Sequence, residues 1–196
     1  MSWSRLLDTP LGQRAKAVYQ ADPGRHYHNW NHVLRLYWHA TETFDLAYDA
    51  NLDMAILAHD VIYDAKPNKE ERSAAWLREY ADTATEMAES HIRKTIDHSV
   101  TDDNRMVLLD LADFLYPEKS AANLETISKE FQALYGLTEQ VFLQGNIGVM
   151  TGIHDRIKSS LPGQASDADQ EMFAKVLDGI KSNLANAQRR LDQLSK

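Results

Sequence analysis

The spacing of apolar residues predicts helices along almost the whole chain. In most segments apolar positions recur every three to four residues, which is the repeat of a helix with one buried face. The longest such stripe lies in residues 167–194 and consists of Phe173, Val176, Leu177, Ile180, Leu184, Ala187, Leu191 and Leu194. No segment alternates apolar and polar residues as a half-buried strand does. We therefore expect an all-α fold of about eight or nine helices that ends in one long C-terminal helix.

Glycine, proline and capping residues divide this pattern into separate helices. The chain contains 8 glycines and 5 prolines, and the apolar repeat continues between them. The predicted helices include residues 32–48, 52–63, 86–98, 103–115, 121–134, 138–158 and 167–194. Residues 161–168 form the one stretch with the composition of a linker. A chain of 196 residues fits one domain, so we expect a single domain over residues 1–196.

The net charge of the chain limits the classes of molecule that it is expected to bind. The net charge is -8, from 21 basic and 29 acidic residues. An acidic surface repels polyphosphate backbones at long range, so a nonspecific nucleic-acid binder is not expected. A bound cation can reverse the sign of the field locally, so a small phosphorylated substrate stays compatible with this charge.

The residue types present also limit the chemistry. Cysteine is absent, which excludes disulfides, thiolate zinc sites, iron–sulfur clusters and a cysteine nucleophile. Any metal must therefore be held by imidazole and carboxylate. No run of about eighteen apolar residues occurs and residues 1–10 lack an apolar signal core, so we expect no membrane span and a cytoplasmic location.

Histidines gather at the start of one predicted helix. Three of the 8 histidines, His26, His28 and His32, lie within a short run, and His32 opens the apolar repeat of residues 32–48. Imidazole is a common ligand of borderline transition metals. A lone histidine on an apolar face is more often a core residue than a ligand, so this cluster needs support from other residues.

That support comes from acidic residues placed inside apolar stretches. His59 and Asp60 interrupt the most apolar part of the chain, and Asp110 and Asp113 interrupt a later apolar stretch. A buried carboxylate is costly unless a partner compensates its charge, and a metal ion would compensate an adjacent His–Asp pair. Asp110 and Asp113 are three residues apart in sequence and would share one face of a helix. The combination predicts a metal site.

The arrangement of His32, the His59–Asp60 pair and a downstream aspartate resembles the H…HD…D pattern of the HD-domain metal-dependent phosphohydrolases. Longer segments resemble a subfamily of small bacterial HD proteins described only as predicted metal-dependent phosphohydrolases, and these segments are residues 25–32, 59–64, 70–74, 95–98, 110–112, 127–131 and 142–145. The resemblance implies an HD-type helical bundle whose core is about residues 20–160. The metal ligands that it implies are His32, His59, Asp60 and Asp110, with Asp113 as the alternative to Asp110.

The resemblance also implies an activity. It points to metal-dependent hydrolysis of a phosphate ester, with a nucleotide as the expected substrate, by a phosphatase, a nucleotidase or a related enzyme. The expected cofactor is one divalent ion, although imidazole with carboxylate does not distinguish Mn, Fe, Co, Ni, Zn or Mg, and a second metal is compatible with the other histidines. The ion would acidify a water molecule and polarise a phosphoryl oxygen, while Asp60 orients or deprotonates that water.

Further polar residues are candidates around this centre. They are Asp64 and Glu70 as catalytic residues, and His28, His98, Arg72 and Lys94 as substrate-binding residues. Each has a structural alternative. Glu70 would also stabilise the dipole of a helix N-terminus, His28 could make a hydrogen bond in a turn, and His98 could end a helix. The two basic residues could be ordinary surface charges.

Two other functions stay open. The chain has Lys69 where the subfamily suggests an asparagine, and it lacks the arginines expected near Ser128 and Asn146. These departures favour a catalytically weak HD module that binds a metal-nucleotide as a sensor or assembly component. The second alternative is an oxygenase on the same scaffold, with two irons held with the help of His28 and His98. The C-terminal stripe could pack on its own domain or on a second copy, so a homodimer is also compatible with the sequence.

Overall fold

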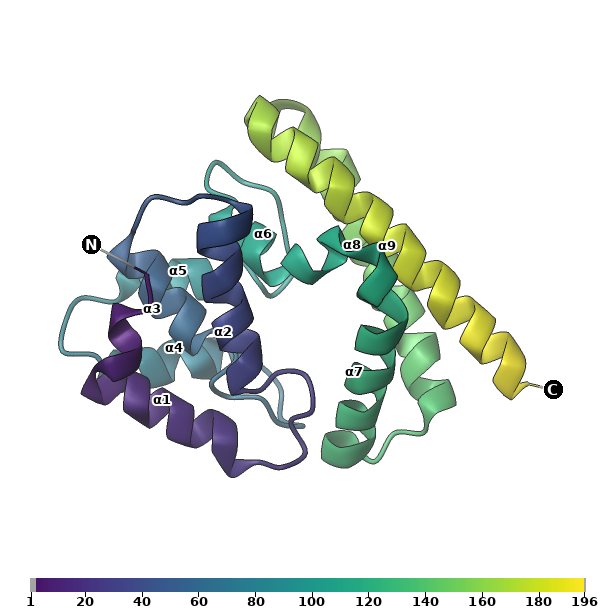
Figure 1. The fold of residues 1–196 in the computed structure, drawn as a ribbon, viewed down its shortest axis with the longest axis horizontal. Helices are drawn as coiled ribbons and strands as arrows, with labels where there is room; N and C mark the ends of the chain where they lie inside the picture. The colour runs from purple at the N-terminus through teal and green to yellow at the C-terminus, as the bar shows by residue number, and fades with distance from the viewer. Residues whose placement is uncertain (1–2, 196) are drawn as a thin grey trace. The chain divides into compact units, whose positions relative to one another are not determined.

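Helices account for the regular structure of this protein. The structure, a computed structural model, describes residues 3–195, apart from the side chains of residues 162–164. Within that range it contains nine α-helices and no strand (Figure 1). The α-helices are α1 (Pro10–Ala21), α2 (Trp30–Trp38), α3 (Ala50–Ala58), α4 (Lys69–Tyr80), α5 (Glu86–Arg93), α6 (Arg105–Asp110), α7 (Ser120–Tyr135), α8 (Glu139–Gln164) and α9 (Asp167–Leu194). The predicted all-α fold with a long C-terminal helix is confirmed. No helix in the described range is long and apolar enough to cross a membrane.

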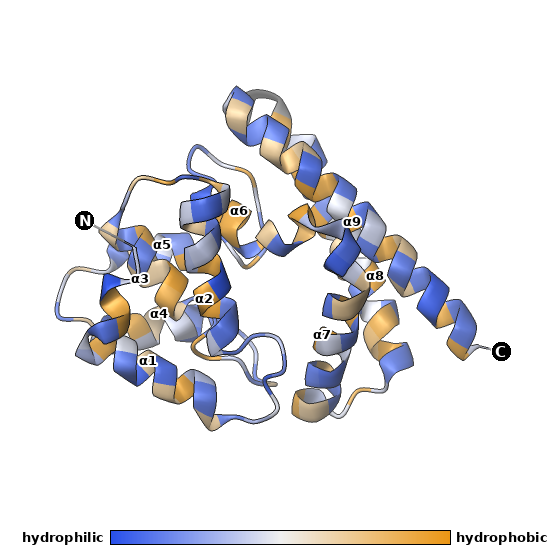
Figure 2. Ribbon diagram, in the orientation of Figure 1, coloured by the Kyte–Doolittle hydropathy of each residue, from blue (hydrophilic) through white to orange (hydrophobic). Residues whose placement is uncertain are grey.

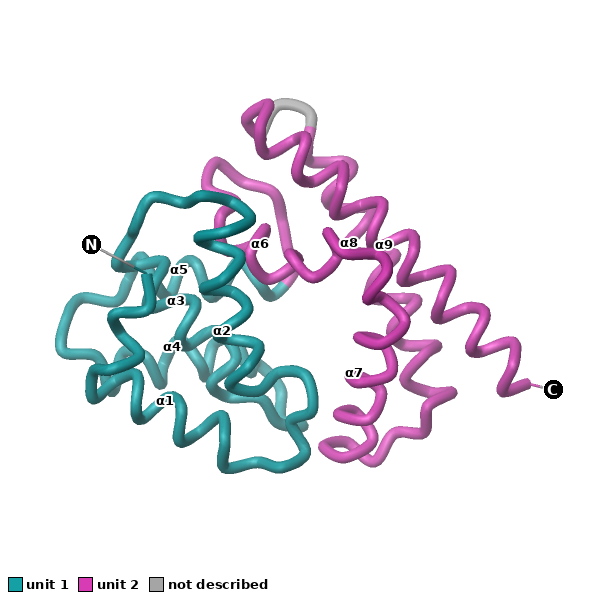
Figure 3. The backbone as a smooth tube through the Cα atoms, in the orientation of Figure 1, with its two compact units in different colours: residues 1–96 teal, residues 97–196 magenta. Residues whose placement is uncertain are grey.

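The helices form two compact units, which Figure 3 colours separately. The first unit, Met1–Ile96, contains α1 to α5, and the second unit, Asp97–Lys196, contains α6 to α9. Both units contain fully buried apolar side chains. The expectation of a single domain over residues 1–196 stays a prediction.

The first unit is organised around α3. Every residue from Leu52 to Ala58 is buried, because α1, α2, α4 and α5 all pack against this helix. A helix that is covered on all sides has no polar face, which explains why this stretch is continuously apolar apart from Asp53. Asp49 caps the helix, and its Oδ1 accepts the N–H groups of Asn51 and Leu52 at 2.8 and 3.2 Å.

Two predicted helices of this unit end earlier than expected. The apolar repeat predicted one continuous helix from residue 32 to residue 48, but α2 ends at Trp38 and a π-helical turn follows over His39–Thr43. Asp45 then has a φ of 45°, in the left-handed region that commonly terminates helices. The helix expected over residues 52–63 ends just before His59, which is the C-cap residue of α3.

Glu89 connects α5 to α4. Its side chain is almost fully buried, and it accepts hydrogen bonds from Arg78 at 2.9 Å, from the Thr85 hydroxyl at 2.8 Å and from Arg93 at 3.2 Å. Arg93 also donates to Glu71 of α4 at 2.9 Å. The hydrogen bond from Arg78 is the main reason that the pKa of Glu89 falls to about 2, below its ordinary value of 4.5.

The second unit is built on its C-terminal helix. α9 packs against α7, α8 and the 3-10 helix Ala112–Leu115, and Phe173, Val176 and Ile180 of its stripe are fully buried. Figure 2 shows apolar residues interspersed with polar ones along α9, as a helix with one buried side requires. The stripe is therefore used within its own unit, and the homodimer stays a prediction.

The connection between α8 and α9 is shorter than predicted. α8 was expected to end near residue 158 but continues to Gln164, and α9 begins at Asp167. The predicted linker, residues 161–168, is thereby reduced to two residues. Ser166 caps α9, because its Oγ accepts the N–H of Asp169 at 3.2 Å.

Gly179 permits a close backbone contact within the second unit. A Cβ at this position would lie 1.8 Å from the carbonyl oxygen of Phe114. Any other residue would therefore push α9 away from the 3-10 helix on which it packs. This position requires glycine because glycine has no side chain, and not because its backbone is flexible.

Replacing Glu89 by glutamine should destabilise the first unit. The Glu89→Gln protein keeps the shape of the side chain but removes the carboxylate that Arg78 and Arg93 share, and Arg93 keeps only its pair with Glu71. Loss of such a charged hydrogen-bond acceptor costs about 1–3 kcal/mol of the free energy of unfolding, which urea denaturation at neutral pH measures. Glu86→Gln removes the same charge from an exposed position of α5 and should cost less than about 0.5 kcal/mol. Equal effects of the two substitutions would contradict the role assigned to Glu89.

The stabilisation from Glu89 should also depend on pH. Folding lowers the pKa of Glu89 from 4.5 to about 2, so its contribution is complete above pH 4.5 and is lost as the pH falls toward 2. The difference in free energy of unfolding between the wild type and Glu89→Gln should therefore shrink across this window. A difference that stays constant throughout the window would show that the carboxylate charge is not the source of the effect.

Candidate metal centre

His32 is positioned by the start of α2. Asn29 caps this helix: its Oδ1 accepts the N–H of Asn31 at 2.9 Å, and its Nδ2 donates to the carbonyl oxygens of Arg25 and His26 at 3.1 and 2.9 Å. The cap orders the residues before the helix and fixes the point at which α2 begins. His32 lies on the first turn of α2 and its side chain is buried.

His59 and Asp60 lie at the C-terminal end of α3, not in the middle of a helix as the apolar pattern predicted. His59 is the C-cap residue and Asp60 belongs to the turn that follows. The two residues are only 1% and 6% exposed. Because the C-terminus of a helix carries a partial negative charge, this location adds to the attraction of Asp60 for a cation.

Three ligand-type atoms converge in the first unit. Nε2 of His32 lies 3.1 Å from Nε2 of His59, and Oδ2 of Asp60 lies 3.3 Å from the His59 nitrogen and 3.8 Å from the His32 nitrogen. A circle through these three atoms has a radius of about 2.0 Å, which is the length of a metal–nitrogen or metal–carboxylate bond in proteins. The three atoms are thus spaced as the ligands of a single metal ion.

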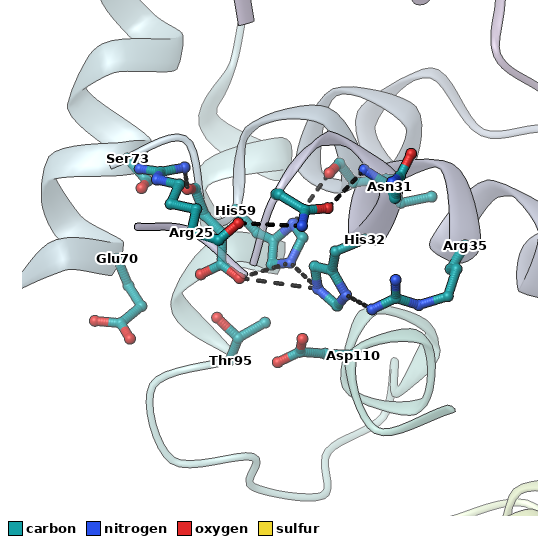
Figure 4. A network of polar contacts seen from close by, with 12 residues as sticks. Arg25, Asn31, His32, Arg35, His59, Glu70, Ser73, Thr95 and Asp110 are labelled. Carbon is teal, nitrogen blue, oxygen red and sulfur yellow. Dashed lines mark hydrogen bonds and ion pairs between the residues drawn. The ribbon is translucent and has the colours of Figure 1, made fainter. Parts of the chain in front are cut away.

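Hydrogen bonds indicate which nitrogen of each ring carries a proton. His59 Nδ1 lies 3.0 Å from the carbonyl oxygen of Ile56, and because a carbonyl only accepts, Nδ1 is protonated. On His32, a guanidinium nitrogen of Arg35 lies 3.3 Å from Nδ1 and donates to it, so the proton of the His32 ring is on Nε2. Figure 4 shows Arg35 on the side of the His32 ring that faces away from His59. Metal binding at Nε2 of His32 would require this proton to move and the Arg35 contact to be released.

Asp60 is ionised at neutral pH despite its burial. Burial by itself raises the pKa of this carboxyl group, but the adjacent His59, with smaller contributions from His28 and Lys69, holds the pKa of Asp60 well below its usual range. The centre therefore combines two imidazoles with one carboxylate. This donor set suits a divalent transition metal.

Arg25 supports the turn that carries Asp60. Its side chain is buried and donates to the carbonyl oxygens of Asp60 and Val61, both at 3.0 Å. Ser73 holds the next residue, because its Oγ accepts the N–H of Ile62 at 3.1 Å. Carbonyl groups at the end of a helix lack partners within the helix, and here side chains provide them. These contacts fix the turn and with it the direction of the Asp60 side chain. The sequence predicted no role for either residue.

His28 and Lys69 both contact the ring of Tyr63. The His28 ring stacks on it with 4.2 Å between centroids and 20° between planes, and Lys69 Nζ lies 4.0 Å from its centroid. The His28 ring is also 5.5 Å from the ring of His32. The predicted substrate-binding residue His28 therefore lies beside His32, a candidate metal ligand. Lys69 stands where an asparagine was expected and adds an ammonium group near Asp60.

Asp64 and Arg72 are bound to each other. Arg72 donates two hydrogen bonds to the Asp64 carboxylate, at 2.9 and 2.5 Å, and others to the carbonyl oxygens of Pro67 and Lys66 at 3.1 and 3.0 Å. The hydrogen bond from Arg72 is the main reason that the pKa of Asp64 falls to about 2. In this arrangement the pair stabilises the loop before α4. A catalytic role for Asp64 and a phosphate contact for Arg72 stay predictions.

Glu70 and Lys94 lie at helix ends. Glu70 is in the first turn of α4, where the helix dipole favours a carboxylate, and its Oε1 lies 3.5 Å from Lys69 Nζ. Lys94 is the C-cap residue of α5, a helix that ends at Arg93 instead of the predicted residue 98. The structural alternative for Glu70 fits this position. The proposed roles of Glu70 in catalysis and of Lys94 in substrate binding stay predictions.

The second unit contains the remaining candidates. His98 Nε2 and Asp110 Oδ2 are 2.9 Å apart, and His98 has a φ of 55°, which is uncommon for residues other than glycine. Asp110 is the last residue of α6, whereas Asp113 lies in the 3-10 helix Ala112–Leu115. The two aspartates are therefore not on one continuous α-helix as predicted, because the helix expected over residues 103–115 is interrupted at Leu111.

Comparisons with known proteins leave the family open. No protein-family model, no curated protein and no solved structure matched this chain. The resemblance to the HD-domain phosphohydrolases therefore rests on the motif residues alone. The structure itself provides a group of histidine and aspartate side chains, His32 and His59 among them, that could hold a metal ion.

Replacing Arg25 should weaken metal binding without removing a ligand. Arg25→Ala leaves the carbonyl groups of Asp60 and Val61 without their donor, so the turn that carries Asp60 becomes free to move. Loss of a residue that orients a metal ligand typically lowers affinity about 10–100-fold. Isothermal titration calorimetry, with Zn²⁺ added to the chelator-treated protein, would measure this loss of affinity.

Arg14→Ala is the matched control for this experiment. Arg14 is an exposed arginine of the same unit whose guanidinium lies over the Tyr80 ring at 4.3 Å. The Arg14→Ala protein should bind Zn²⁺ as the wild type does. Wild-type affinity in an Arg25→Ala protein with an unchanged circular dichroism spectrum would rule out a role of Arg25 in the centre.

Proposed function

We propose that this chain is a metal-dependent hydrolase of phosphate esters, with a nucleotide as the substrate class. The observation that carries the proposal is the spacing of His32 Nε2, His59 Nε2 and Asp60 Oδ2 on a circle of about 2.0 Å radius. The burial of these groups supports it, since an ionised carboxylate inside a protein needs a compensating charge. The choice of a phosphate ester follows from the resemblance of the motif residues to those of the HD-domain phosphohydrolases.

Asp110 is the proposed fourth ligand. It follows the His–Asp pair in the order of the HD pattern and interrupts an otherwise apolar stretch. Its hydrogen bond with His98 supports the proposal, because carboxylate ligands are commonly oriented by a hydrogen-bonding neighbour. Two imidazoles and two carboxylates would leave coordination positions for water and substrate on an ion that accepts more than four ligands.

The side chains around the centre suit an anionic substrate. A bound ion would supply an acidic water molecule and polarise a phosphoryl oxygen. Asp60, whose pKa is held well below its usual range, is a weak base, so we assign it the role of ligand and of hydrogen-bond acceptor that orients the water. His28, beside His32, would donate a hydrogen bond to a phosphoryl oxygen, and Lys69 adds positive charge in a protein whose net charge is -8.

Hydrolysis should depend on both the metal and Asp60. Chelation should abolish hydrolysis of a panel of nucleoside monophosphates, deoxynucleoside triphosphates and cyclic nucleotides, followed by chromatography of the nucleoside and nucleotide products, and Mn²⁺ or Co²⁺ should restore it. Asp60→Asn keeps the shape of the side chain but removes its charge, and should lower kcat/KM by about 100-fold or more. Asp82→Asn, an exposed position of the same unit, should leave kcat/KM unchanged.

The alternative functions give different results in this assay. Metal-dependent nucleotide binding without turnover of any ester would contradict hydrolysis and support the sensor or assembly module. Two irons per chain, found by elemental analysis, would support the oxygenase. A fully active Asp60→Asn protein would show that the proposed centre takes no part in the reaction.

Paired substitutions should identify the fourth ligand. Loss of a residue that orients a metal ligand lowers affinity about 10–100-fold, and Asp110→Asn should lower the affinity for Zn²⁺ at least as much. Asp113→Asn should leave the affinity near the wild-type value. Both substitutions remove one carboxylate from adjacent helical segments, so each is the control for the other. A larger loss in Asp113→Asn would overturn the assignment of Asp110.

A further inference from the structure

A pocket in the second unit lies between α7, the start of α8 and the C-terminal part of α9. Its volume is about 500 Å³, which falls in the range of sites for small organic molecules. All of the residues that line it belong to the second unit. It contains none of the proposed metal ligands, so its occupancy does not depend on the proposed hydrolysis.

The floor of the pocket is apolar. Leu124 of α7 and Leu143 of α8 line it and are 4% and 1% exposed. They form one buried cluster with Phe142 and with Ala187 of α9. The floor is therefore part of the packed interior of the unit, and a ligand in the pocket would cover the small apolar surface that the floor still exposes.

Ser128 adds a polar group to this pocket. It lines the pocket and is only 8% exposed. A hydroxyl both donates and accepts hydrogen bonds, so a polar atom of a ligand in this pocket could bond to Ser128.

The charged side chains of the pocket leave one cation without a carboxylate. Lys129 pairs with Glu125 at 2.7 Å, and Arg190 pairs with Glu139 at 2.7 Å. Arg189 also lines the pocket and donates to the amide oxygen of Asn186. In the described part of the chain it has no acidic partner. The pocket thus combines a surplus positive charge with an apolar floor.

We propose that this pocket binds a small organic anion that carries an apolar ring or chain. The carboxylate or phosphate group of the ligand contacts Arg189 through charge-assisted hydrogen bonds. Its apolar part lies against Leu124 and Leu143, and Ser128 hydrogen-bonds to a polar atom of the ligand. An inorganic anion lacks the apolar part, and a neutral apolar molecule lacks the charge, so both should bind more weakly.

Nuclear magnetic resonance titration of the full chain, in the presence of EDTA, tests this proposal. The probes are benzoate and phenylphosphonate, which carry a ring and a charge, with acetate and benzyl alcohol as probes that lack one of the two. Benzoate or phenylphosphonate should shift the backbone amide signals of Ser128 and Arg189 in a saturable manner. Acetate and benzyl alcohol should bind at least about tenfold more weakly, as expected for loss of one of the two contacts.

Two substitutions and a control complete the test. Arg189→Ala should weaken binding about tenfold, because it removes the charged hydrogen bond, and Ser128→Leu should weaken it as well, because it removes the hydroxyl and places a larger apolar side chain in the pocket. Lys181→Ala removes an exposed cation of α9 that pairs with Asp178 outside the pocket and should leave binding unchanged. Equal loss in Arg189→Ala and Lys181→Ala would overturn the proposal. So would undiminished binding in a folded Ser128→Leu protein, or the absence of shifts with both anionic probes.

Discussion

The charge of the buried Asp60 carboxylate is the constraint that the surrounding structure has to satisfy. An ion in a protein interior costs several kcal/mol unless opposite charge and hydrogen bonds compensate it. Here the compensation comes mainly from His59, whose Nε2 lies 3.3 Å from Asp60 Oδ2, with smaller contributions from His28 and Lys69. These groups reach each other because α3 ends just before His59 and because Arg25 holds the turn that follows. His32 Nε2 lies 3.8 Å from the same carboxylate oxygen, so the compensation of the buried charge and the proposed metal centre rest on one arrangement of side chains.

The main elements of this centre could be predicted from the sequence. His59 and Asp60 were recognisable because polar residues inside the most apolar stretch need partners, and His32 because it begins an amphipathic helix. The contribution of Arg25 could not be predicted, since it contacts backbone carbonyl oxygens and the identity of its partners leaves no trace in the sequence. The pairing of Asp64 with Arg72 could not be predicted for a different reason. The path of the loop between the two residues, and not their spacing in the sequence, brings their side chains together.

The fold class and the long C-terminal helix followed from the apolar repeat, but several helix ends did not. The repeat continues beyond Trp38 and beyond Ala58, although the backbone leaves the α-helical path at a π-helical turn and at the His59–Asp60 turn. Periodicity reports which side chains are buried and does not report the backbone geometry that buries them. The break between Asp110 and Asp113 has the same cause. The apolar residues continue into the 3-10 helix Ala112–Leu115, but its different backbone geometry changes the direction in which side chains point.

The two units carry different kinds of polar feature. In the first unit, two imidazoles and a buried carboxylate lie close together. In the second unit, a pocket between three helices is lined by buried leucines, a serine hydroxyl and a surplus of positive charge. The first arrangement suits a metal ion and the second suits an organic anion, so the two proposed sites would differ in their recognition chemistry.

The central claim is that one metal ion binds between the two imidazoles and Asp60. A crystal structure of the zinc-soaked protein, with data collected at the zinc absorption edge, tests it most directly. We expect one anomalous peak at about 2.0–2.2 Å from Nε2 of His32, Nε2 of His59 and a carboxylate oxygen of Asp60, with Arg35 withdrawn from His32 Nδ1. Zinc bound elsewhere, with the two imidazoles still hydrogen-bonded to each other, would contradict the proposed centre.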